Sequence, residues 1–323
     1  MIKLEISKPV WLIGTSLLAD EYVKVLKKMG VDVIVIGRSE AGSKAFYNRT
    51  GIVAYFGGLE KFISENPKLP VNAINAVDVL GLLETSKLLI DYGVKNILVE
   101  KPGAVNLAQV TELNSYAHAH NASVWVAYNR RFFKSVMEAK ELIKKDGGGL
   151  YCRFDFTEAS DEIQELKTAK SIKERWLYGN STHVIDTVFH LIGRPCDATI
   201  DVAGANKLSW HPSGAIFRGF GKSITGCEFS YHSDWQVPGR WSIEVATKNF
   251  KLSFCPMEEL QVMRRGSFSW EKSVENLSRV DKCKPGFFEQ VYRFLNNDIS
   301  QLCSTEEHLE NFKFYKKIAN YDD

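Results

Sequence analysis

Strand-like and helix-like patterns alternate over the first third of this 323-residue chain, and this alternation restricts the fold more than any other feature. Short apolar runs such as Val10–Ile13 and Val31–Ile36 are typical of buried strands, and helical spacing follows them, as in Ala19–Met29 before Gly30. Strands that alternate with helices predict a parallel, doubly wound sheet. The remaining strands are expected at 52–55, 72–77, 97–99 and 124–127, and the remaining helices at 41–48, 59–63, 84–92 and 107–120.

The pattern changes after Gly147-Gly148-Gly149, which is a stop signal for a helix over Val136–Lys145. Strands dominate beyond it, with a single helix from about His183. The strands are expected at 150–156, 198–202, 215–220, 223–229, 241–246, 250–254 and 260–263, and two closing helices at 287–295 and 305–318. This predicts an α/β chain with two domains, over 1–122 and 123–323. The second is an α+β domain with a large, mostly antiparallel open sheet, and its closing helices are expected to pack back on the first domain.

The composition argues against several classes of partner. The net charge is +2, from 41 basic and 39 acidic residues, so we expect neither nucleic acid nor an anionic membrane as a partner. No apolar run approaches the roughly 20 residues that span a bilayer. The six cysteines are widely spaced, without a C-x-x-C pair, which favours a reduced, cytoplasmic protein without a zinc site.

The first predicted strand leads into a turn that resembles a dinucleotide-binding fingerprint. In the run Gly14-Thr15-Ser16-Leu17-Leu18-Ala19, the first glycine and last alanine of G-x-G-x-x-G/A are kept, and Ser16 replaces the middle glycine. The helix N-terminus that follows would offer backbone N–H donors to a pyrophosphate. We therefore predict a Rossmann-type dinucleotide-binding domain over 1–122, with Gly14, Thr15, Ser16 and Leu17 at the cofactor. The competing interpretation is an ordinary βα turn.

The end of the second predicted strand bears on the choice of cofactor. An NAD site usually places a carboxylate here for the ribose 2′-hydroxyl, whereas this chain has Gly37-Arg38-Ser39. Arginine suits a phosphate monoester, and serine can donate a further hydrogen bond. We therefore predict that Arg38 and Ser39 favour NADP(H) over NAD(H), with NAD(H) still possible. The alternative is that Arg38 is a plain surface residue.

Glu100-Lys101-Pro102 follows the predicted strand Ile97–Val99. The proline biases Lys101 toward an extended conformation, so the lysine is presented at a strand end, where ligands bind in open α/β sheets. A lysine there can hold a hydroxyl or carbonyl oxygen of a small molecule. Taken by itself, a lysine after a strand is usually just a solvated charge.

His183 is the candidate proton acceptor. Asn180, Ser181 and Thr182 are good N-cap types, which would place His183 in the first turn of a helix, where the dipole keeps imidazole neutral. Packing or capping alone is an equally open interpretation. His183, Asp186 and His190 also fall near one helical face, but no further ligands accompany them and no metal is predicted. Asp186 is expected to orient a neighbour, and His190 to pack.

Three motifs together resemble one enzyme family. The segments "VEKPGA" at 99–104, "YNRRF" at 128–132 and "STHVIDTVFHLIG" at 181–193 resemble the Gfo/Idh/MocA oxidoreductases, which include glucose-fructose oxidoreductase and inositol dehydrogenase. "VATKNFKLSF" and "FFEQVYRFLNN" extend the likeness over the whole chain. The resemblance implies an N-terminal Rossmann domain and a second domain that binds substrate and forms a homodimer or homotetramer through its open sheet. It also implies reversible NAD(P)-dependent oxidation of a hydroxyl on a sugar, cyclitol or nucleotide-sugar.

The same resemblance assigns roles to residues. Lys101 would hold the reacting oxygen and His183 would be the acid/base. Five residues would meet substrate, namely Asn129, Arg130, Arg131, Trp176 and Asn180, and Val77 and Glu100 join Lys101 at the cofactor. The chain departs from the family at Gly179, where many members carry an aspartate, and at Val77-Asp78, where a Thr-Pro pair is usual. Two alternatives stay open: a non-catalytic dinucleotide-binding regulatory protein, and an NAD-dependent glycosidase.

Overall fold

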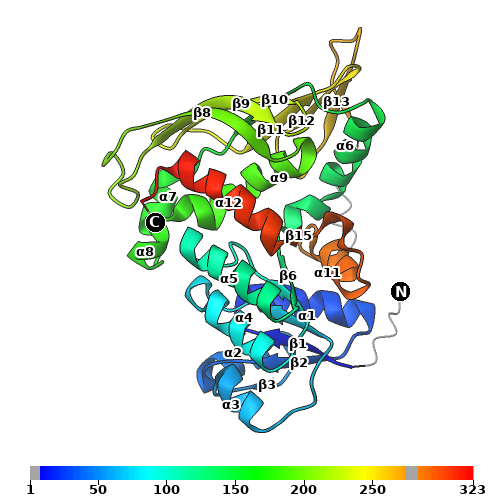
Figure 1. Ribbon diagram of the computed structural model, residues 1–323, viewed down its shortest axis with the longest axis vertical. Helices are drawn as coiled ribbons and strands as arrows, with labels where there is room; N and C mark the ends of the chain where they lie inside the picture. The colour runs from blue at the N-terminus through cyan, green and yellow to red at the C-terminus, as the bar shows by residue number, and fades with distance from the viewer. Residues whose placement is uncertain (1–7, 274–282, 323) are drawn as a thin grey trace. The chain divides into compact units, whose positions relative to one another are not determined.

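The computed structural model describes residues 8–273 and 283–322, and it divides the chain into two compact units (Figure 1). Unit 1 contains residues 1–129 and 281–309, and unit 2 contains residues 130–280 and 310–323. The first division lies after residue 129 and not after residue 122, because β6 (Ser123–Val126) pairs with β5 (Asn96–Val99) and so belongs to the first sheet. The segment 281–309 returns to unit 1 late in the chain.

Unit 1 is built on a seven-stranded sheet in the order β15-β6-β5-β4-β1-β2-β3. All neighbours are parallel except β15, which pairs antiparallel with β6. The other strands are β1 (Val10–Ile13), β2 (Val33–Ile36), β3 (Ala54–Tyr55), β4 (Asn72–Asn75) and β15 (Cys303–Ser304). The strand order reverses between β1 and β4, so the carboxyl ends of these two strands flank the switch point at which such sheets bind ligands.

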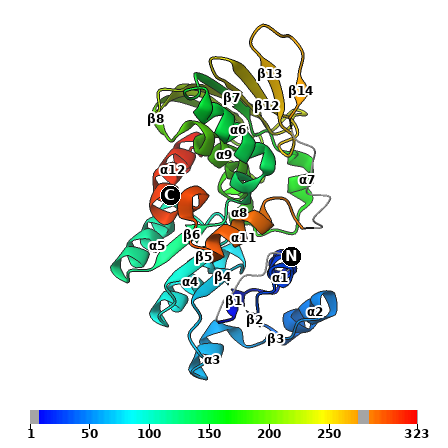
Figure 2. The same ribbon diagram turned by 90° about the vertical axis from the view of Figure 1, so that its right-hand side faces the viewer.

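Helices cover both faces of this sheet, as Figure 2 shows. One layer contains α1 (Leu17–Met29), α2 (Glu40–Thr50) and α11 (Phe287–Leu295), and the other contains α3 (Gly58–Ser64), α4 (Leu82–Asp91) and α5 (Leu107–Ala119). Gly30 ends α1 in the left-handed conformation that glycine permits, at φ 70°. α11, the first of the two closing helices, packs on α1 within unit 1.

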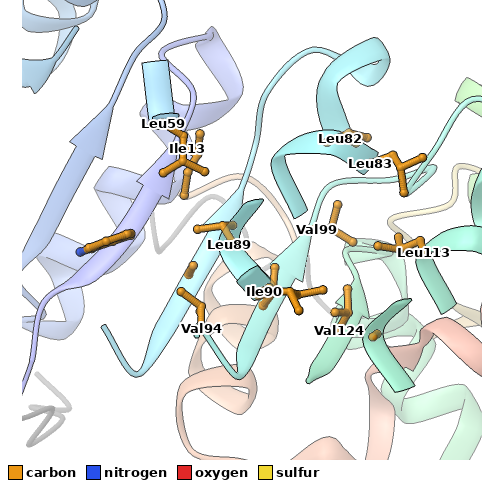
Figure 3. Close-up of a cluster of buried hydrophobic side chains, with 14 of the residues drawn as sticks. Ile13, Leu59, Leu82, Leu83, Leu89, Ile90, Val94, Val99, Leu113 and Val124 are labelled. Carbon is orange, nitrogen blue, oxygen red and sulfur yellow. The ribbon is translucent and has the colours of Figure 1, made fainter. Parts of the chain in front are cut away.

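The main core of unit 1 lies between the sheet and the layer of α3, α4 and α5 (Figure 3). α4 is amphipathic, and its buried face presents Leu82, Leu89 and Ile90 toward the strands. These side chains are almost completely removed from water, and each contributes roughly 1.5–3 kcal/mol of transfer free energy to folding. The predicted doubly wound sheet is confirmed.

Unit 2 is built on an eight-stranded sheet in the order β14-β13-β12-β11-β7-β10-β9-β8. Every pair is antiparallel except β7 with β10, as predicted for the second sheet. The strands are β7 (Tyr151–Asp155), β8 (Pro195–Ala203), β9 (Ile216–Ser223), β10 (Glu228–Asp234), β11 (Ser242–Ala246), β12 (Phe250–Phe254), β13 (Gln261–Arg264) and β14 (Glu271–Lys272). The predicted strand over 223–229 is wrong, because β9 ends at Ser223 and a turn with Gly226 at φ 87° precedes β10.

One face of the second sheet is covered by helices. α9 (Thr182–Ile192) packs on β7 and β11, and α6 (Lys134–Lys145) packs on α9. The part of α12 (Thr305–Ala319) that belongs to unit 2 adds Phe314, whose ring contacts Phe189 and Phe229. Two short helices, α7 (Ser160–Glu165) and α8 (Lys170–Lys173), precede α9, so the expectation of a single helix in this part of the chain is wrong.

No helix within residues 8–273 and 283–322 combines the length and the apolar character that crossing a bilayer requires.

Candidate functional site

The turn between β1 and α1 can exist only with glycine at position 14. Gly14 has φ 123°, and a Cβ atom there would lie within 3.0 Å of the carbonyl oxygen of Ala76. The backbone of β1 can therefore approach the end of β4 closely. Ser16 is the N-cap of α1, and its hydroxyl makes no capping hydrogen bond. The N-terminus of α1 thus presents backbone N–H groups and a serine hydroxyl together, which suits a phosphate.

A cleft of about 640 Å³ opens at this turn within unit 1. Its walls come from the ends of β1, β2 and β4, which meet at the switch point of the sheet. Six of the residues predicted to bind cofactor line it, namely Gly14, Thr15, Ser16, Arg38, Ser39 and Val77. Leu17 does not line it, because its side chain points into solvent and is 73% exposed. Neither Glu100 nor Lys101 belongs to its lining.

Ser39 and Arg38 lie where β2 leads into α2. Ser39 is the N-cap of α2, and its Oγ accepts a hydrogen bond of 3.1 Å from the N–H of Gly42, which leaves the hydroxyl proton available to a ligand. Arg38 is exposed at the rim of the cleft. This corner has a positive side chain, a hydroxyl donor and a helix N-terminus. The carboxylate among the residues that line the cleft is that of Asp78, which follows β4 and not β2.

A second arginine braces the turn, and sequence reasoning missed it. Arg49 lies on α2, and its Nη2 donates to the carbonyl oxygen of Thr15 over 2.8 Å. The same guanidinium donates to both carboxylate oxygens of Asp20, at 2.6 and 3.0 Å. Arg49 thereby ties the Gly14–Ser16 turn to α1 and α2. A lone arginine in a helical pattern carries no sequence signal for such a role.

Lys101 follows β5, as predicted, and the residues around it are closely held. The N–H of Glu100 donates to the carbonyl oxygen of Asn75 on β4 over 2.9 Å, and the Lys101–Pro102 peptide bond is cis. The carbonyl oxygen of Pro102 receives a 2.8 Å hydrogen bond from His308 Nε2. Lys101 itself is half-buried. The loop that presents the lysine is therefore pinned on both sides.

Glu100 is a buried carboxyl behind Lys101. Tyr22 donates its hydroxyl hydrogen to Glu100 Oε1 over 2.5 Å, and the N–H of Lys101 donates to Glu100 Oε2 over 3.2 Å. Burial raises the pKa of the Glu100 carboxyl, and the hydrogen bond from Tyr22 and the positive charges of Lys101 and Lys284 oppose this effect. Burial and the nearby carboxyl also raise the pKa of Tyr22 well above its ordinary value. Glu100 thus supports the loop of Lys101 and does not line the cofactor cleft.

The helix that carries His183 begins differently from the prediction. A π-helical turn over Leu177–Ser181 runs directly into α9, and the N–H of Thr182 donates to the carbonyl oxygen of Leu177. Ser181 has helical dihedral angles and makes no capping hydrogen bond, so the predicted N-cap is wrong. The backbone N–H groups near His183 therefore already donate hydrogen bonds within the continuous helix. The imidazole does not lie at a free helix N-terminus, where a helix dipole would act on it. The side chain of His183 is 8% exposed.

A buried carboxylate stands beside this π-helical turn. Glu158, in the loop after β7, accepts hydrogen bonds from Asn180 Nδ2 over 2.9 Å and from Ser181 Oγ over 2.6 Å. Its side chain is 7% exposed. Position 179 is a glycine, and the sequence pattern did not indicate Glu158, because a lone glutamate after a strand is ordinarily a surface residue. The side-chain amide of Asn180 is directed to this carboxylate.

Arg131 and Asp186 form a buried ion pair. Arg131 donates from Nε and Nη2 to the two carboxylate oxygens over 2.8 and 2.6 Å, and each side chain is 1% exposed. This arrangement contradicts the predicted substrate contact of Arg131, because its guanidinium is buried and donates two hydrogen bonds to the Asp186 carboxylate. Lys140 contacts the ring of His190 at 3.0 Å. Among the described residues, no group of three or more His, Cys, Asp or Glu side chains gathers as metal ligands would.

Arg130 has a different environment from Arg131. Its guanidinium lies 4.8 Å from the ring centre of Trp241 and 5.7 Å from that of Phe133. The ring of Trp241 also faces His183, with the two ring centres 6.2 Å apart. Unit 2 therefore brings Arg130 and His183 to the same indole ring. Burial lowers the pKa of Arg130 to about 10, although the charges of Glu258 and Glu158 oppose the shift.

Two further predicted substrate residues have their own contacts. Asn129, at the end of unit 1, donates from Nδ2 to the carbonyl oxygen of Pro285 over 3.0 Å. Trp176 is half-buried and makes an edge contact with Trp210, with ring centres 6.2 Å apart. Neither contact tests the predicted role. Lys101 lies in unit 1 and His183 in unit 2.

Comparison with known proteins places this geometry in context. No protein-family model matches the chain. A curated relative, the uncharacterized oxidoreductase YhhX of Escherichia coli K12, is 31% identical over 123 residues. This match covers 37% of the chain and 34% of the relative, so the chain matches only about a third of that protein's length.

Solved structures resemble the chain over nearly its whole length. Levoglucosan dehydrogenase, in complex with NADH and levoglucosan, has a TM-score of 0.78 at 15% identity and covers 97% of this chain and 96% of its own. An oxidoreductase from Agrobacterium radiobacter, in complex with NAD+, L-tartaric acid and magnesium, has a TM-score of 0.76 at 12% identity, with coverages of 96% and 94%. A dehydrogenase from Clostridium difficile has a TM-score of 0.76 at 16% identity, with coverages of 97% and 99%. These likenesses show that the chain has the fold of these oxidoreductases, and they confirm the predicted fold class.

Proposed function

We propose that this protein is an NAD(P)-dependent dehydrogenase that transfers a hydride to or from a hydroxyl-bearing carbon of a small carbohydrate-type molecule. The observation that carries the proposal is the cleft at the β1–α1 turn, which combines Gly14, a helix N-terminus and the switch point of a parallel sheet. Proteins of the same fold support it, since levoglucosan dehydrogenase binds NADH and a sugar.

The residues of the cleft fit a dinucleotide. The close approach of Gly14 to Ala76 and the free hydroxyl of Ser16 suit a pyrophosphate at the N-terminus of α1. We propose that Arg38 and Ser39 hold the 2′-phosphate of NADP(H), so that NADP(H) binds more tightly than NAD(H). A bound nicotinamide ring would supply the hydride acceptor or donor.

Two residues would move the proton and hold the reacting oxygen. We propose that Lys101 holds the substrate oxygen and stabilises its alkoxide-like state, and that His183 takes the hydroxyl proton or returns it in the reductive direction. Asn180 and Arg130, near His183 in unit 2, would contact substrate, and we propose the same role for Asn129 and Trp176. Glu158 would fix the orientation of Asn180 through the hydrogen bond between them.

Substitution of both proposed chemical residues tests the function. Lys101→Ala and His183→Ala should each lower kcat by roughly 100-fold or more, since general acid–base catalysis contributes about 10²–10⁴-fold. The dissociation constant of NADPH, measured by fluorescence, should stay within about threefold of the parent value, because neither side chain lines the cofactor cleft. Lys44→Ala, an exposed lysine on α2, is the matched control.

Three results would contradict the proposal. Full turnover in both variants would remove Lys101 and His183 from the mechanism. Tight dinucleotide binding without oxidation of any member of a sugar panel would favour a regulatory binding protein. Cleavage of glycosides with no net change in the dinucleotide would favour an NAD-dependent glycosidase.

We also propose that unit 2 forms a homodimer or homotetramer through the open face of its sheet. The face opposite α9 exposes Phe220 and Tyr151, which are 62% and 41% accessible. Neighbouring positions on this face carry mixed polar side chains, such as Arg153 and Glu244. Light scattering coupled to gel filtration measures the oligomeric state, and Phe220→Glu should shift it to monomer. The six cysteines are widely spaced in the sequence and form no C-x-x-C pair, which supports our proposal of a cytoplasmic location.

A further inference from the structure

Arg130 is a cation whose hydrogen-bonding groups are not used within the described part of the chain. It follows Asn129 in a 3₁₀ turn (Asn129–Phe132), and its Nε atom is buried with no acceptor. Its guanidinium rests instead on the rings of Trp241 and Phe133, at 4.8 and 5.7 Å. Aromatic rings attract a cation, but they do not replace the oxygen acceptors to which the five N–H donors of a guanidinium can bond.

Arg131, the next residue in the chain, is a buried arginine, and it has a carboxylate partner. Arg131 binds both oxygens of Asp186 in the two-pronged geometry that arginine and carboxylate favour. Arg130 has two carboxyls in its neighbourhood, on Glu158 and Glu258, and both act on its charge. Neither forms an ion pair with it within the described residues, and Glu158 already accepts hydrogen bonds from Asn180 and Ser181. Arg130 therefore lacks the bidentate partner that Arg131 has.

A partly buried guanidinium without such a partner is costly to maintain, because it has lost water without gaining acceptors. Burial accordingly lowers the pKa of Arg130 to about 10. A bound anion with two or three oxygens would restore the missing hydrogen bonds. The position of Arg130 also matters, because its guanidinium and the ring of His183 lie near the same indole ring, that of Trp241.

We propose that Arg130 binds an anionic group of the substrate, so that the substrate is a sugar acid or a sugar phosphate and not a neutral sugar. This inference rests on the proposed function. The anionic group would form a two-pronged contact with Arg130 while the apolar face of the substrate lies against Trp241. A hydroxyl elsewhere on the same molecule would then reach His183. A carboxylate and a phosphate monoester share this chemistry, and the experiment below distinguishes them.

Matched substrates test the inference. Each neutral aldose is compared with the aldonate, the uronate and the 6-phosphate of the same sugar, by dinucleotide absorbance in both directions. The acidic members should have kcat/KM values roughly 10- to 100-fold above their neutral counterpart, as a charge-assisted hydrogen bond implies. Whichever series shows the preference, the carboxylates or the phosphates, identifies the anionic group. Arg130→Gln should remove this preference, mainly by raising KM for the acidic member toward that of the neutral sugar.

Direct binding provides a second measurement that does not depend on turnover. Calorimetric titration of the NADPH-loaded protein with each acid should give an affinity that falls roughly 10- to 100-fold in Arg130→Gln. Arg265→Gln, an exposed arginine of unit 2, should change neither measurement. An acidic preference that survives in Arg130→Gln, or neutral sugars used as well as their acids, would overturn this inference alone. A protein that binds neither NADPH nor NADH would overturn the proposed function, and acids that bind it through Arg130 would still support the anion site.

Discussion

At the scale of single residues, the rim of the cofactor cleft offers a direct test of NADP(H) preference. Arg38 is exposed beside the N-terminus of α2, so a 2′-phosphate would add an ion pair that a 2′-hydroxyl cannot form. We predict that Arg38→Ala raises the dissociation constant of NADPH roughly 10- to 100-fold and leaves that of NADH within about threefold. Fluorescence titration measures both, with Lys44→Ala as the control on the same helix. An equal rise in the dissociation constants of NADPH and NADH would show that Arg38 does not distinguish a 2′-phosphate from a 2′-hydroxyl.

Glu158 is a second residue whose contacts predict a measurable effect. Both of its oxygens accept hydrogen bonds, one from Asn180 and one from Ser181. In Glu158→Ala both acceptor oxygens are removed, so the buried amide of Asn180 and the hydroxyl of Ser181 lose these hydrogen bonds. We predict a loss of about 1–3 kcal/mol in the free energy of unfolding, and a lower kcat because Asn180 is released beside His183. Chemical denaturation and steady-state kinetics measure the two effects. If the variant had the free energy of unfolding and the kcat of the parent, Glu158 would not hold Asn180 in position.

The sequence could identify some of these residues but not their partners. Gly14 and Lys101 were recognisable because a strand, a turn residue and a helix surround each in a fixed order. Arg130 and Arg131 are adjacent and identical in type, so the sequence pattern could not show which of the two forms an ion pair with a buried carboxylate. That distinction depends on Asp186, which is 55 positions away. Tyr22 and Glu158 were missed for the same reason, since their roles arise from contacts between distant segments.

At the scale of elements, the turn from β1 to α1 predicts a strict requirement for glycine. Gly14→Ala would place a Cβ atom within 3.0 Å of the Ala76 carbonyl oxygen, at a φ of 123°. Backbone strain of this kind costs about 1–3 kcal/mol, and the turn must also move away from β4. We predict reduced stability and a loss of NADPH affinity of about 100-fold or more, measured by denaturation and fluorescence titration.

Gly51→Ala is the matched control for this substitution. Gly51 also has a positive φ, 69°, but open space surrounds the position of its Cβ atom. It should lose about 1 kcal/mol of stability and keep the parent affinity for NADPH. A similar loss of affinity in both variants would show that general destabilisation, and not the close approach of Gly14 to β4, explains the result.

Helices and strands were predicted correctly where the residues that determine them lie close together in the sequence. The helices that end at Gly30 and Gly93 were predicted because glycine permits the left-handed backbone that stops them. The segment 223–229 does not form one strand, because Gly226 turns the chain there at a positive φ. The helical start near Asn180 was misplaced because three N-cap residue types lie within a π-helical turn that forms only in the folded unit. Short helices such as α7 and α8 carry too few residues for a periodic signal.

The anchor of the C-terminal segment in unit 2 predicts a dependence of stability on pH. His211 is fully buried, its Nδ1 donates to the Gly214 carbonyl oxygen, and its Nε2 accepts from the Tyr321 hydroxyl. Burial, together with the positive charge of Arg175, lowers the pKa of His211 to about 4, although the hydrogen bond to Gly214 opposes this shift. Between pH 6.5 and 4 the unfolded chain therefore binds a proton that the folded chain does not. Stability should be full above pH 6.5 and should fall by up to about 3 kcal/mol as the pH drops to 4.

Denaturant unfolding at several pH values measures this slope. Other carboxyls titrate in the same range, so the informative quantity is the difference between the parent and His211→Gln. The variant should be less stable at pH 7, and the difference should shrink toward pH 4. A constant difference over that range would show that His211 does not titrate in this way.

At the scale of the whole molecule, each unit has a sheet and a core of its own, although the chain passes between them more than once. Segment 281–309 supplies β15 and α11 to unit 1, and the last residues return to unit 2. The sequence pattern could place the two sheets, because strand and helix alternation differs between them. The return of α11 to unit 1 agrees with the expectation that the closing helices pack back on the first domain. The sequence did not show that β15 joins the first sheet or that the last residues return to unit 2, since the closing helices carry the same apolar spacing whichever unit they join.

Separate cores predict that a defect in one unit leaves the chemistry of the other intact. Phe312 is completely buried in unit 2, with its ring centre 4.2 Å from that of Tyr178. Phe312→Ala should cost about 3–5 kcal/mol, whereas Leu89→Ala should cost about 2–5 kcal/mol in the core of unit 1. Hydrogen exchange followed by mass spectrometry should show lost protection within 130–273 for the first variant and within 10–126 for the second. Phe312→Ala should retain the parent affinity for NADPH at temperatures where the protein is folded, because the cleft lies wholly in unit 1. If both variants lost protection throughout the chain and lost NADPH binding together, the two units would fold as one cooperative body and this prediction would be wrong.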